Sequence, residues 1–250
     1  MRIDTFLIEN GFFDSRTKAK QSIERGEVYL KDKQILKASF SLDSFSKDDI
    51  SVIKEKDYVS IGAYKIEKAL KDFNFSVENL TCADLGSSTG GFTDCLLQYG
   101  AKKVYAIDVN TSILHDKLKA DNRVISLKKN VKDVNKTDFS DEIDLAVCDL
   151  SFISATLVLP AINAFLYENK HVILLIKPQF EMQKRFHAKN GILKDFKQIR
   201  NAIKNVYDSA MLNGLIPINF TSAPFYENKN REYLILLEKN STNVLSWSDI

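Results

Sequence analysis

The chain has 250 residues and a formal net charge of only +2, and 44% of its residues are hydrophobic. This composition excludes a disordered chain and provides enough apolar side chains for one large domain, or for a small domain joined to a medium one. Because the overall charge is close to neutral, any surface that binds nucleic acid must be confined to one part of the chain.

The sequence carries no signal for export or for a membrane. Asp4 and Glu9 interrupt the stretch in which a signal peptide is continuously apolar. No segment reaches the ~20 apolar residues that a membrane-spanning helix needs. The cysteines Cys82, Cys95 and Cys148 are odd in number and far apart, which favours buried reduced thiols over disulfides or metal ligands. We therefore expect a soluble cytoplasmic protein without a metal site or a membrane partner.

The first sixty residues predict a small domain of two helices and a hairpin. A short helix is indicated before Gly11, which stops it. Ser15 is a typical N-cap for a second helix over residues 16–25. Residues 27–37 then predict a β-hairpin that turns at residues 31–33.

Basic residues are concentrated on the second of these helices. Arg16, Lys18, Lys20 and Arg25 lie there with Glu24 as the one acidic residue. Such a cluster can be a solvated helix face, or it can be a surface that contacts phosphate groups. Charge alone leaves both interpretations open.

The order of these features resembles the S4 RNA-binding module. The similarity extends over about residues 1–50 and rests on the motifs Arg2-Ile-Asp4, Ser15-Arg16-x-x-Ala19 and Ile23-x-x-Gly26-x-Val28, followed by the hairpin. It implies that phosphate contacts hold this domain against structured RNA without reading the base sequence. The RNA-binding residues that it implies are Arg2, Arg16, Lys18, Lys20 and Arg25. We assign residues 1–58 to an S4-like domain and residues 59–65 to a linker.

From Tyr58 on, strands and helices alternate. The expected strands are Cys82–Leu85, Val104–Ile107, Leu145–Cys148, Val172–Ile176, Pro217–Phe220 and Tyr233–Leu237. The expected helices between them are Gly91–Tyr99, Ser154–Tyr167 and Lys194–Asn213. Strands that are apolar throughout and joined by helices predict an α/β fold, Rossmann-like, with a sheet covered on both faces. This domain should span residues 66–240, with a polar, loosely held tail at residues 241–250.

A glycine-rich turn follows the first of these strands and opens a helix. Its sequence is Asp84-Leu-Gly86-Ser87-Ser88-Thr-Gly90-Gly91-Phe92. Glycines at this topological position let the backbone turn tightly and approach a nucleotide-like ligand. Asp108 ends the next strand, where a carboxylate can accept hydrogen bonds from both ribose hydroxyls of an adenosine.

The departures of this turn from the dinucleotide-binding pattern bear on the cofactor. Ser88 stands where a pyrophosphate would require the middle glycine, and Asp84 adds an acid before the turn. Both features favour S-adenosylmethionine over a nicotinamide or flavin nucleotide, and a purely structural turn is the third interpretation. The expected cofactor-binding residues are Asp84, Gly86, Ser87, Ser88, Gly90, Gly91, Phe92, Asp108 and Asp149.

Four charged residues lie at the ends of predicted elements: Lys65, Asp149, Lys177 and Glu232. Methyl transfer to a hydroxyl needs a base, and a lysine can serve where burial and a neighbouring cation lower its pKa. Each residue also has an ordinary interpretation. Lys65 could be an exposed helix lysine and Asp149 a helix cap. Lys177 could be a solvated charge at a strand end, and Glu232 could form a surface ion pair. Convergence of the four on one crevice would favour catalysis.

Together these motifs resemble the TlyA family. The similarity covers nearly the whole chain, through Tyr58-Val-Ser60-x-Gly62-Ala-Tyr-Lys65, the glycine turn, Asp149-x-Ser151-Phe152-Ile153-Ser154, Lys177-Pro178-Gln179-Phe180-Glu181 and Asn230-x-Glu232-Tyr233. Members of that family are cytidine 2′-O-ribose methyltransferases of ribosomal RNA, often named hemolysins, with an S4 domain fused to an FtsJ-like methyltransferase. The resemblance implies that Lys177 is the base, that Asp149 orients it, and that Lys65 and Glu232 hold the ribose.

Two positions depart from the family pattern. Ile61 stands where arginine is usual, and residues 223–229 lack the expected glycines, so RNA contacts of these segments are in doubt. The chain is short at both ends, as in members that act on large-subunit RNA alone. We therefore expect 23S ribosomal RNA as the substrate, with 16S ribosomal RNA as the alternative, either as free RNA or in a ribosomal subunit, and no obligate protein partner.

Other functions fit the sequence less well. An amino-directed methyltransferase would carry an Asn/Asp-Pro-Pro-aromatic motif, whereas Asp149 is followed by Leu-Ser-Phe. An enzyme that methylates base C5 needs a cysteine nucleophile, and Cys148 lies within an apolar strand. A secreted hemolysin and a non-catalytic S4-type RNA-binding protein are the remaining alternatives.

Overall fold

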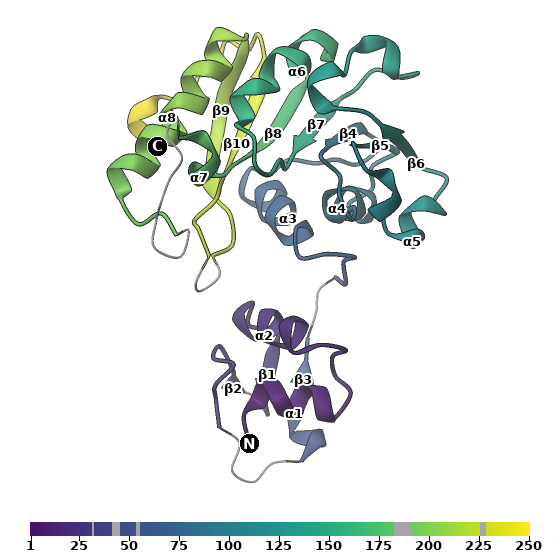
Figure 1. Cartoon of the computed structure of the whole chain (residues 1–250), viewed down its shortest axis with the longest axis vertical. Coiled ribbons are helices and arrows are strands. Elements are labelled where there is room, and N and C mark those ends of the chain that lie inside the picture. Colours follow the sequence, from purple (N-terminus) through teal and green to yellow (C-terminus); the bar gives the residue numbers. More distant parts are fainter. Residues whose placement is uncertain (32, 42–45, 54–55, 183–191, 226–228) are drawn as a thin grey trace. The chain divides into compact units, whose positions relative to one another are not determined.

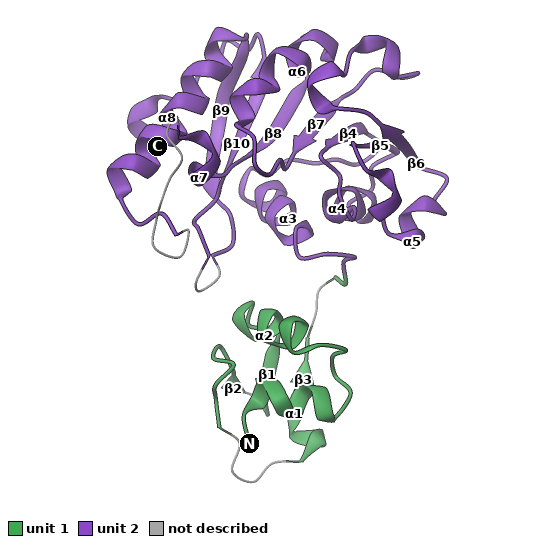
Figure 2. Cartoon of the chain, in the orientation of Figure 1, with its two compact units in different colours: residues 1–57 green, residues 58–250 purple. Residues whose placement is uncertain are grey.

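The computed structural model describes residues 1–31, 33–41, 46–53, 56–182, 192–225 and 229–250. The chain divides into two compact units, unit 1 (Met1–Asp57) and unit 2 (Tyr58–Ile250) (Figure 2). Residues 59–65, the expected linker, fall in unit 2, and helix α3 already begins at Ala63.

Unit 1 is a small α+β domain. Its elements are α1 (Ile3–Glu9), α2 (Arg16–Glu24), β1 (Val28–Leu30), β2 (Lys33–Gln34), a 3-10 turn (Lys47–Asp49) and β3 (Ile50–Val52). Ser15 caps α2 by accepting a hydrogen bond from the Lys18 backbone N–H, as predicted. The antiparallel sheet has the order β2-β1-β3, so the expected hairpin is confirmed and β3 is an addition. Ile3, Leu7 and Ile23 are fully buried and join the helices to the sheet.

Unit 2 contains a seven-stranded sheet of order β6-β5-β4-β7-β8-β10-β9 (Figure 1). The strands are β4 (Thr81–Leu85), β5 (Lys103–Asp108), β6 (Val124–Lys128), β7 (Leu145–Cys148), β8 (His171–Ile176), β9 (Leu215–Ser222) and β10 (Tyr233–Lys239). Strands β4 to β8 are parallel, whereas β10 is antiparallel to both β8 and β9. All six expected strands are confirmed, and β6 is an edge strand that the sequence analysis missed.

Helices cover both faces of this sheet, as expected. They are α3 (Ala63–Asp72), α4 (Gly91–Gln98), α5 (Asp116–Lys119), α6 (Leu159–Phe165), α7 (Pro178–Glu181) and α8 (Phe196–Leu212). Alternate residues of each strand point to opposite faces: Leu145 and Val147 of β7 pack with α3 and α4, and Ala146 and Cys148 pack with α6 and α8. Such a two-sided core explains why these strands are apolar throughout. The three cysteines, all within the described residues, are buried and do not form disulfides.

Residues 241–250 differ from the loose tail that we expected. The Tyr207 hydroxyl of α8 donates a hydrogen bond to the carbonyl oxygen of Leu245. The Leu245 backbone N–H donates to the carbonyl oxygen of Pro217 in β9. Trp247 and Ile250 pack against the core. The apolar residues in this short segment therefore anchor it to unit 2.

Candidate active site

The sheet topology brings Lys177 and Glu232 together. Lys177 directly follows β8, and Glu232 directly precedes β10. Because these strands are antiparallel and Tyr233 pairs with Ile176, the two charged residues occupy the same edge of the sheet. Asp149 follows β7, whose parallel pairing with β8 places its carboxyl end at that edge as well.

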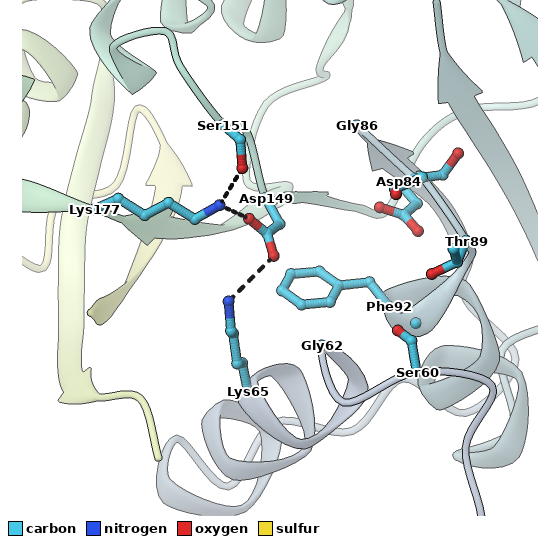
Figure 3. Close-up of a pocket in the computed structure, with 13 residues that line it drawn as sticks. Ser60, Gly62, Lys65, Asp84, Gly86, Thr89, Phe92, Asp149, Ser151 and Lys177 are labelled. Carbon is cyan, nitrogen blue, oxygen red and sulfur yellow. Dashed lines mark hydrogen bonds and ion pairs between the residues drawn. The ribbon is translucent and has the colours of Figure 1, made fainter. Parts of the chain in front are cut away.

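The four predicted residues form a continuous series of ion pairs. The Lys177 ammonium lies 2.5 Å from Asp149 Oδ1 and 2.8 Å from the Ser151 hydroxyl oxygen, which accepts its hydrogen bond. Lys65 Nζ lies 3.5 Å from Asp149 Oδ2 and 2.7 Å from Glu232 Oε2. Figure 3 shows Lys177 and Lys65 approaching Asp149 from different sides. The order of charges is therefore Lys177, Asp149, Lys65, Glu232, with positive and negative alternating.

The charged side chains of this series are largely buried. Lys177 is only 7% exposed at the end of an apolar strand, so its charge needs the carboxylate of Asp149 beside it. Burial alone would lower the pKa of Lys65, but Asp149 and Glu232 raise it above the ordinary lysine value. The Lys65 ammonium therefore stays charged, and Asp149 is shared by two cations.

The sequence analysis missed the role of Glu181. Its carboxylate accepts hydrogen bonds from the Ala155 backbone N–H, at 2.9 Å, and from the Ser154 hydroxyl. Burial raises the pKa of Glu181, against the lowering effect of these two donors. Glu181 and Ser154 were both within the motifs that carry the family resemblance, but only the fold shows that they meet.

A cavity of about 260 Å³ opens beside the ion pairs (Figure 3). Its lining residues are Ser60, Gly62, Lys65, Asp84, Gly86, Ser87, Ser88, Thr89, Gly91, Phe92, Asp149, Ser151 and Lys177. It thus joins the glycine turn to the candidate catalytic side chains. Gly90 and Asp108, which were also predicted to bind the cofactor, do not line it.

Gly86 and Gly90 shape the turn. Gly86 has φ +85°, and a Cβ atom there would lie 2.9 Å from the backbone oxygen of Asp149. Gly90 has φ +92°, and its Cβ would lie 2.2 Å from Leu118. At both positions a larger residue is disfavoured by the left-handed backbone conformation and also by the close contact that its Cβ atom would make. The role of Gly90 is therefore to form the turn rather than to line the cavity.

Asp108 also supports the turn. Its carboxylate accepts hydrogen bonds from the backbone N–H groups of Ser88 and Asn110, each at 2.9 Å. The acid at the end of β5 is thus held next to the glycine turn, as the sequence pattern predicted. Its contact with a cofactor ribose stays a prediction.

Asp84 places a buried carboxylate in the wall of the cavity. Its Oδ2 accepts hydrogen bonds from the backbone N–H and hydroxyl of Thr93. Its Oδ1 is buried and has no hydrogen-bond partner among the described residues. Burial raises the pKa of Asp84 to about 7. A buried carboxylate with one unused oxygen fits a ligand that brings a positive charge, as S-adenosylmethionine does with its ammonium and sulfonium groups.

The five basic residues of unit 1 that were predicted to bind RNA are all engaged with carboxylates. Arg2 and Arg16 both contact the buried Asp4, at 3.0 Å and 2.9 Å. The remaining pairs are Lys18 with Asp14, Lys20 with Glu24, and Arg25 with Glu27. The Arg25 side chain is only 14% exposed, which makes it the least accessible of the five. Carboxylates from outside α2 therefore balance part of the positive charge that the sequence of this helix alone indicated.

Comparison with known proteins decides the family. Residues 58–239 match the FtsJ-like methyltransferase family. The chain belongs to this family. It is a methyltransferase that uses S-adenosylmethionine, in agreement with the cavity and the unpaired oxygen of Asp84.

Full-length relatives place this FtsJ-like methyltransferase in the TlyA family, as predicted. Hemolysin A of Brachyspira hyodysenteriae is 42% identical over 94% of this chain and 98% of its own length. The 16S/23S rRNA (cytidine-2′-O)-methyltransferase TlyA of Mycobacterium tuberculosis is 31% identical, over 98% and 92% of the two chains. The 23S rRNA (cytidine-2′-O)-methyltransferase TlyA of Campylobacter jejuni is 35% identical, over 81% and 85%.

The described residues also bear on membranes and metals. Every helix in that part of the chain falls short of the length and apolarity needed to cross a membrane. The same residues contain no group of three His, Cys, Asp or Glu side chains suited to a metal ion.

Proposed function

We propose that this FtsJ-like methyltransferase methylates the 2′-hydroxyl of a cytidine ribose in ribosomal RNA, with 23S RNA as the substrate. The observation that carries the proposal is the Lys177–Asp149–Lys65–Glu232 series beside the cofactor cavity. Two relatives are named as rRNA (cytidine-2′-O)-methyltransferases. The Campylobacter jejuni protein is named for 23S rRNA, and the Mycobacterium tuberculosis protein for both 16S and 23S rRNA. Action on 16S rRNA as well is the alternative that the experiment below distinguishes.

Lys177 is the proposed base. A ribose 2′-hydroxyl is a poor nucleophile, so its proton must be removed as its oxygen attacks. Bound S-adenosylmethionine supplies an electrophilic methyl group on a sulfonium. Lys177, once its own proton has left, accepts the hydroxyl proton at Nζ, while Asp149 and Ser151 fix the position of that nitrogen. Because Lys177 is buried, the positive charge that develops on its nitrogen is stabilised by Asp149 rather than by water.

Lys65 and Glu232 hold the ribose. Lys65 carries a lasting positive charge, because the two carboxylates raise its pKa. Its ammonium donates to ribose oxygen atoms, and Glu232 accepts from a neighbouring hydroxyl. Asp149 is shared by Lys65 and Lys177. The charge of Lys65 therefore weakens the electrostatic attraction between that carboxylate and the base. The pair thus orients the nucleophile and adjusts the base together.

The cofactor residues divide by the part of the donor that they hold. Asp84 offers its unused oxygen to a positive group, and Phe92 provides an apolar wall of the cavity. Gly86 and Gly91 allow close approach of the backbone, and Ser87 and Ser88 add polar contacts from the turn. Asp108 is the proposed partner of the adenosine ribose. Asp149 contacts Lys177 and also lines the cavity, so it is common to the donor site and the base.

We further propose that unit 1 is an S4-like domain that holds structured RNA. Lys18 and Lys20 can exchange their carboxylate partners for phosphates, because exposed ion pairs contribute little. Arg2 and Arg16 are about half exposed or more and share the buried Asp4, so they would keep that pairing and contact phosphates through their remaining N–H groups. Arg25 is better suited to support the fold, through Glu27. The enzyme would then act in the cytoplasm on ribosomal RNA or ribosomal subunits, without an obligate protein partner.

Mapping of ribose methylation on ribosomal RNA tests the proposal. RNA is prepared from cells with the gene, without it, and complemented with the wild type or with Lys177→Ala, and both large rRNAs are scanned for 2′-O-methylcytidine. One methylated cytidine in 23S rRNA should disappear without the gene and return with the wild-type chain alone. Unchanged rRNA in all four preparations would disprove the function. A second gene-dependent site in 16S rRNA would mean that the enzyme acts on both 16S and 23S rRNA rather than on 23S rRNA alone.

A further inference from the structure

A second pocket lies outside the cofactor cavity. It encloses about 300 Å³ between the start of α8 and the segment that leads into β10. Its lining residues are Ile192, Leu193, Lys194, Phe196, Ile199, Phe225, Lys229 and Arg231. Leu193 and Ile199 are each 5% exposed, whereas Phe196 and Phe225 are 73% and 58% exposed. The pocket therefore has an apolar base and two aromatic rings at its rim.

Specific contacts connect the two segments that form this pocket. The Leu193 backbone N–H donates a hydrogen bond of 2.7 Å to Asn230 Oδ1. The Arg231 guanidinium carbon lies 5.1 Å from the centre of the Phe225 ring, a cation–π arrangement. These contacts hold the aromatic rim and the cation in a defined arrangement.

The pocket shares a chain segment with one of the candidate catalytic residues. Arg231 directly precedes Glu232, whose carboxylate lies 2.7 Å from Lys65 Nζ. The segment that carries Arg231 enters β10 at the same sheet edge as Lys177. A chain molecule with one unit on the ion-pair series can therefore extend along this segment from Glu232 towards the pocket.

The lining residues define the chemistry of the ligand. Lys194, Lys229 and Arg231 are basic, and none of the described residues that line the pocket is acidic. Exposed rings beside cations form stacking surfaces for bases whose backbone is anionic. A purely apolar protein segment would gain nothing from the three cations, and the volume is at the lower end of small-ligand sites.

We propose that this pocket binds one unstacked base of the RNA, next to the nucleotide that is methylated. The inference rests on the proposed function and adds to it a substrate-specificity site in unit 2. Phe225 and Phe196 stack on the base, and Lys194, Lys229 and Arg231 contact the flanking phosphates. Recognition would favour a single-stranded or splayed-out segment, because a base inside a duplex cannot reach the rings.

The first test compares steady-state kinetics of the full-length enzyme on a protein-free 23S rRNA transcript. Phe225→Ala should raise the KM for RNA about 5- to 100-fold, the effect of losing one stacked base. Phe225→Trp should keep the KM near the wild-type value. Leu212→Ala is the matched control, because Leu212 is an 87% exposed apolar residue at the far end of α8. The dissociation constant for S-adenosylmethionine, from calorimetry, should be unchanged in all three variants.

The second test locates the base. RNA fragments around the methylated cytidine are made with a single abasic nucleotide at each neighbouring position. One position should raise the wild-type KM as much as Phe225→Ala does, and should have no further effect in that variant. Additive effects at every position, or an unchanged KM in Phe225→Ala, would overturn the pocket while methylation by the wild type leaves the proposed function intact. A defect seen only with assembled subunits, and not with the transcript, would assign the pocket to a ribosomal protein and equally overturn the inference.

Discussion

Glu181 accepts a hydrogen bond from the hydroxyl of Ser154, across 27 residues of sequence. This contact joins the segment after β7, which carries Asp149 and Ser151, to the segment after β8, which carries Lys177. The segment after β7 also contains Phe152, whose φ is +68°. This conformation is costly for an aromatic residue and is kept only where neighbouring residues impose it. Glu181 is therefore a positioning residue: it touches neither cofactor nor ribose in our proposal, but it fixes the loop that does.

Glu181→Ala should lower both activity and stability. The substitution leaves the buried Ala155 N–H without its acceptor, which costs about 1–3 kcal/mol of the free energy of unfolding. It should also reduce kcat about 10-fold, with little change in the affinity for S-adenosylmethionine. Glu181→Gln keeps an acceptor oxygen and should recover most of both quantities. Chemical denaturation and single-turnover kinetics provide the two measurements, and a full kcat in the alanine variant would remove the positioning role.

Lys177→Ala should abolish methyl transfer while the cofactor still binds. Loss of a general base typically reduces the rate about 10²- to 10⁴-fold. The cofactor dissociation constant should stay within about three-fold, because Lys65 remains beside Asp149 and balances its charge. Lys177→Arg is the control: it preserves the positive charge but cannot accept a proton at neutral pH. Turnover by either variant near the wild-type rate would mean that another group takes the proton.

Much of unit 2 could be predicted because burial leaves a clear pattern. Strands with both faces covered are continuously apolar, and these, together with the edge strand β9, were located within two residues of their observed limits. Strand β6 was missed because it is an edge strand with mixed exposure, in which Ser126 and Lys128 interrupt the apolar run. Residues 241–250 were misjudged because a few apolar anchors, among them Trp247, are enough to hold a mostly polar segment.

The pairing of charges was less predictable than their positions. Motif spacing indicated which four residues should meet, but the order of the ion pairs depends on the antiparallel register of β10 with β8, which no local pattern reveals. The same limit applies to unit 1. Asp4 and Asp14 lie outside α2 in sequence, so a count along that helix could not include their contacts with Arg16 and Lys18.

Asp84→Asn should change the pH dependence of both folding and cofactor binding. An acid whose pKa is raised to about 7 by burial retains its proton in the folded state after the unfolded chain has lost it, near pH 4. The wild-type free energy of unfolding should therefore fall between about pH 4 and pH 7, and this fall should be absent from the variant. Thermal melts of the two unliganded proteins across that range measure the difference, and parallel curves would contradict the shifted pKa.

Cofactor affinity should follow the opposite trend. Above about pH 7 the wild-type Asp84 is ionised and attracts a positive group, so its affinity for S-adenosylmethionine should rise through that pH. The asparagine variant should lack this rise and bind about 10- to 100-fold more weakly at pH 8, the value of a charge-assisted hydrogen bond. Calorimetry at pH 6 and pH 8 provides the comparison. Equal affinities at pH 8 would exclude a contact between Asp84 and a positive group of the cofactor.

Asp108→Ala should weaken cofactor binding for two separable reasons. The carboxylate is the proposed partner of the adenosine ribose, and it also holds the glycine turn through Ser88 and Asn110. Asp108→Asn keeps an acceptor for the turn but loses the charge. If the ribose contact exists, both variants should raise the dissociation constant for S-adenosylmethionine about 10-fold or more. A normal value in the asparagine variant, with a raised one in the alanine variant, would leave Asp108 with the turn alone.

Arg16→Ala combined with Lys20→Ala should weaken RNA binding and flatten its salt dependence. Each lost phosphate contact lowers the slope of log affinity against log salt by about one, so the double variant should lose about two. Arg16 also pairs with the buried Asp4, so Lys20→Ala alone is needed to separate RNA contact from the stability of unit 1. Lys204→Ala is a matched control, because Lys204 forms the same kind of i,i+4 ion pair on α8. An unchanged slope in the double variant would make the α2 cations a solvated helix face.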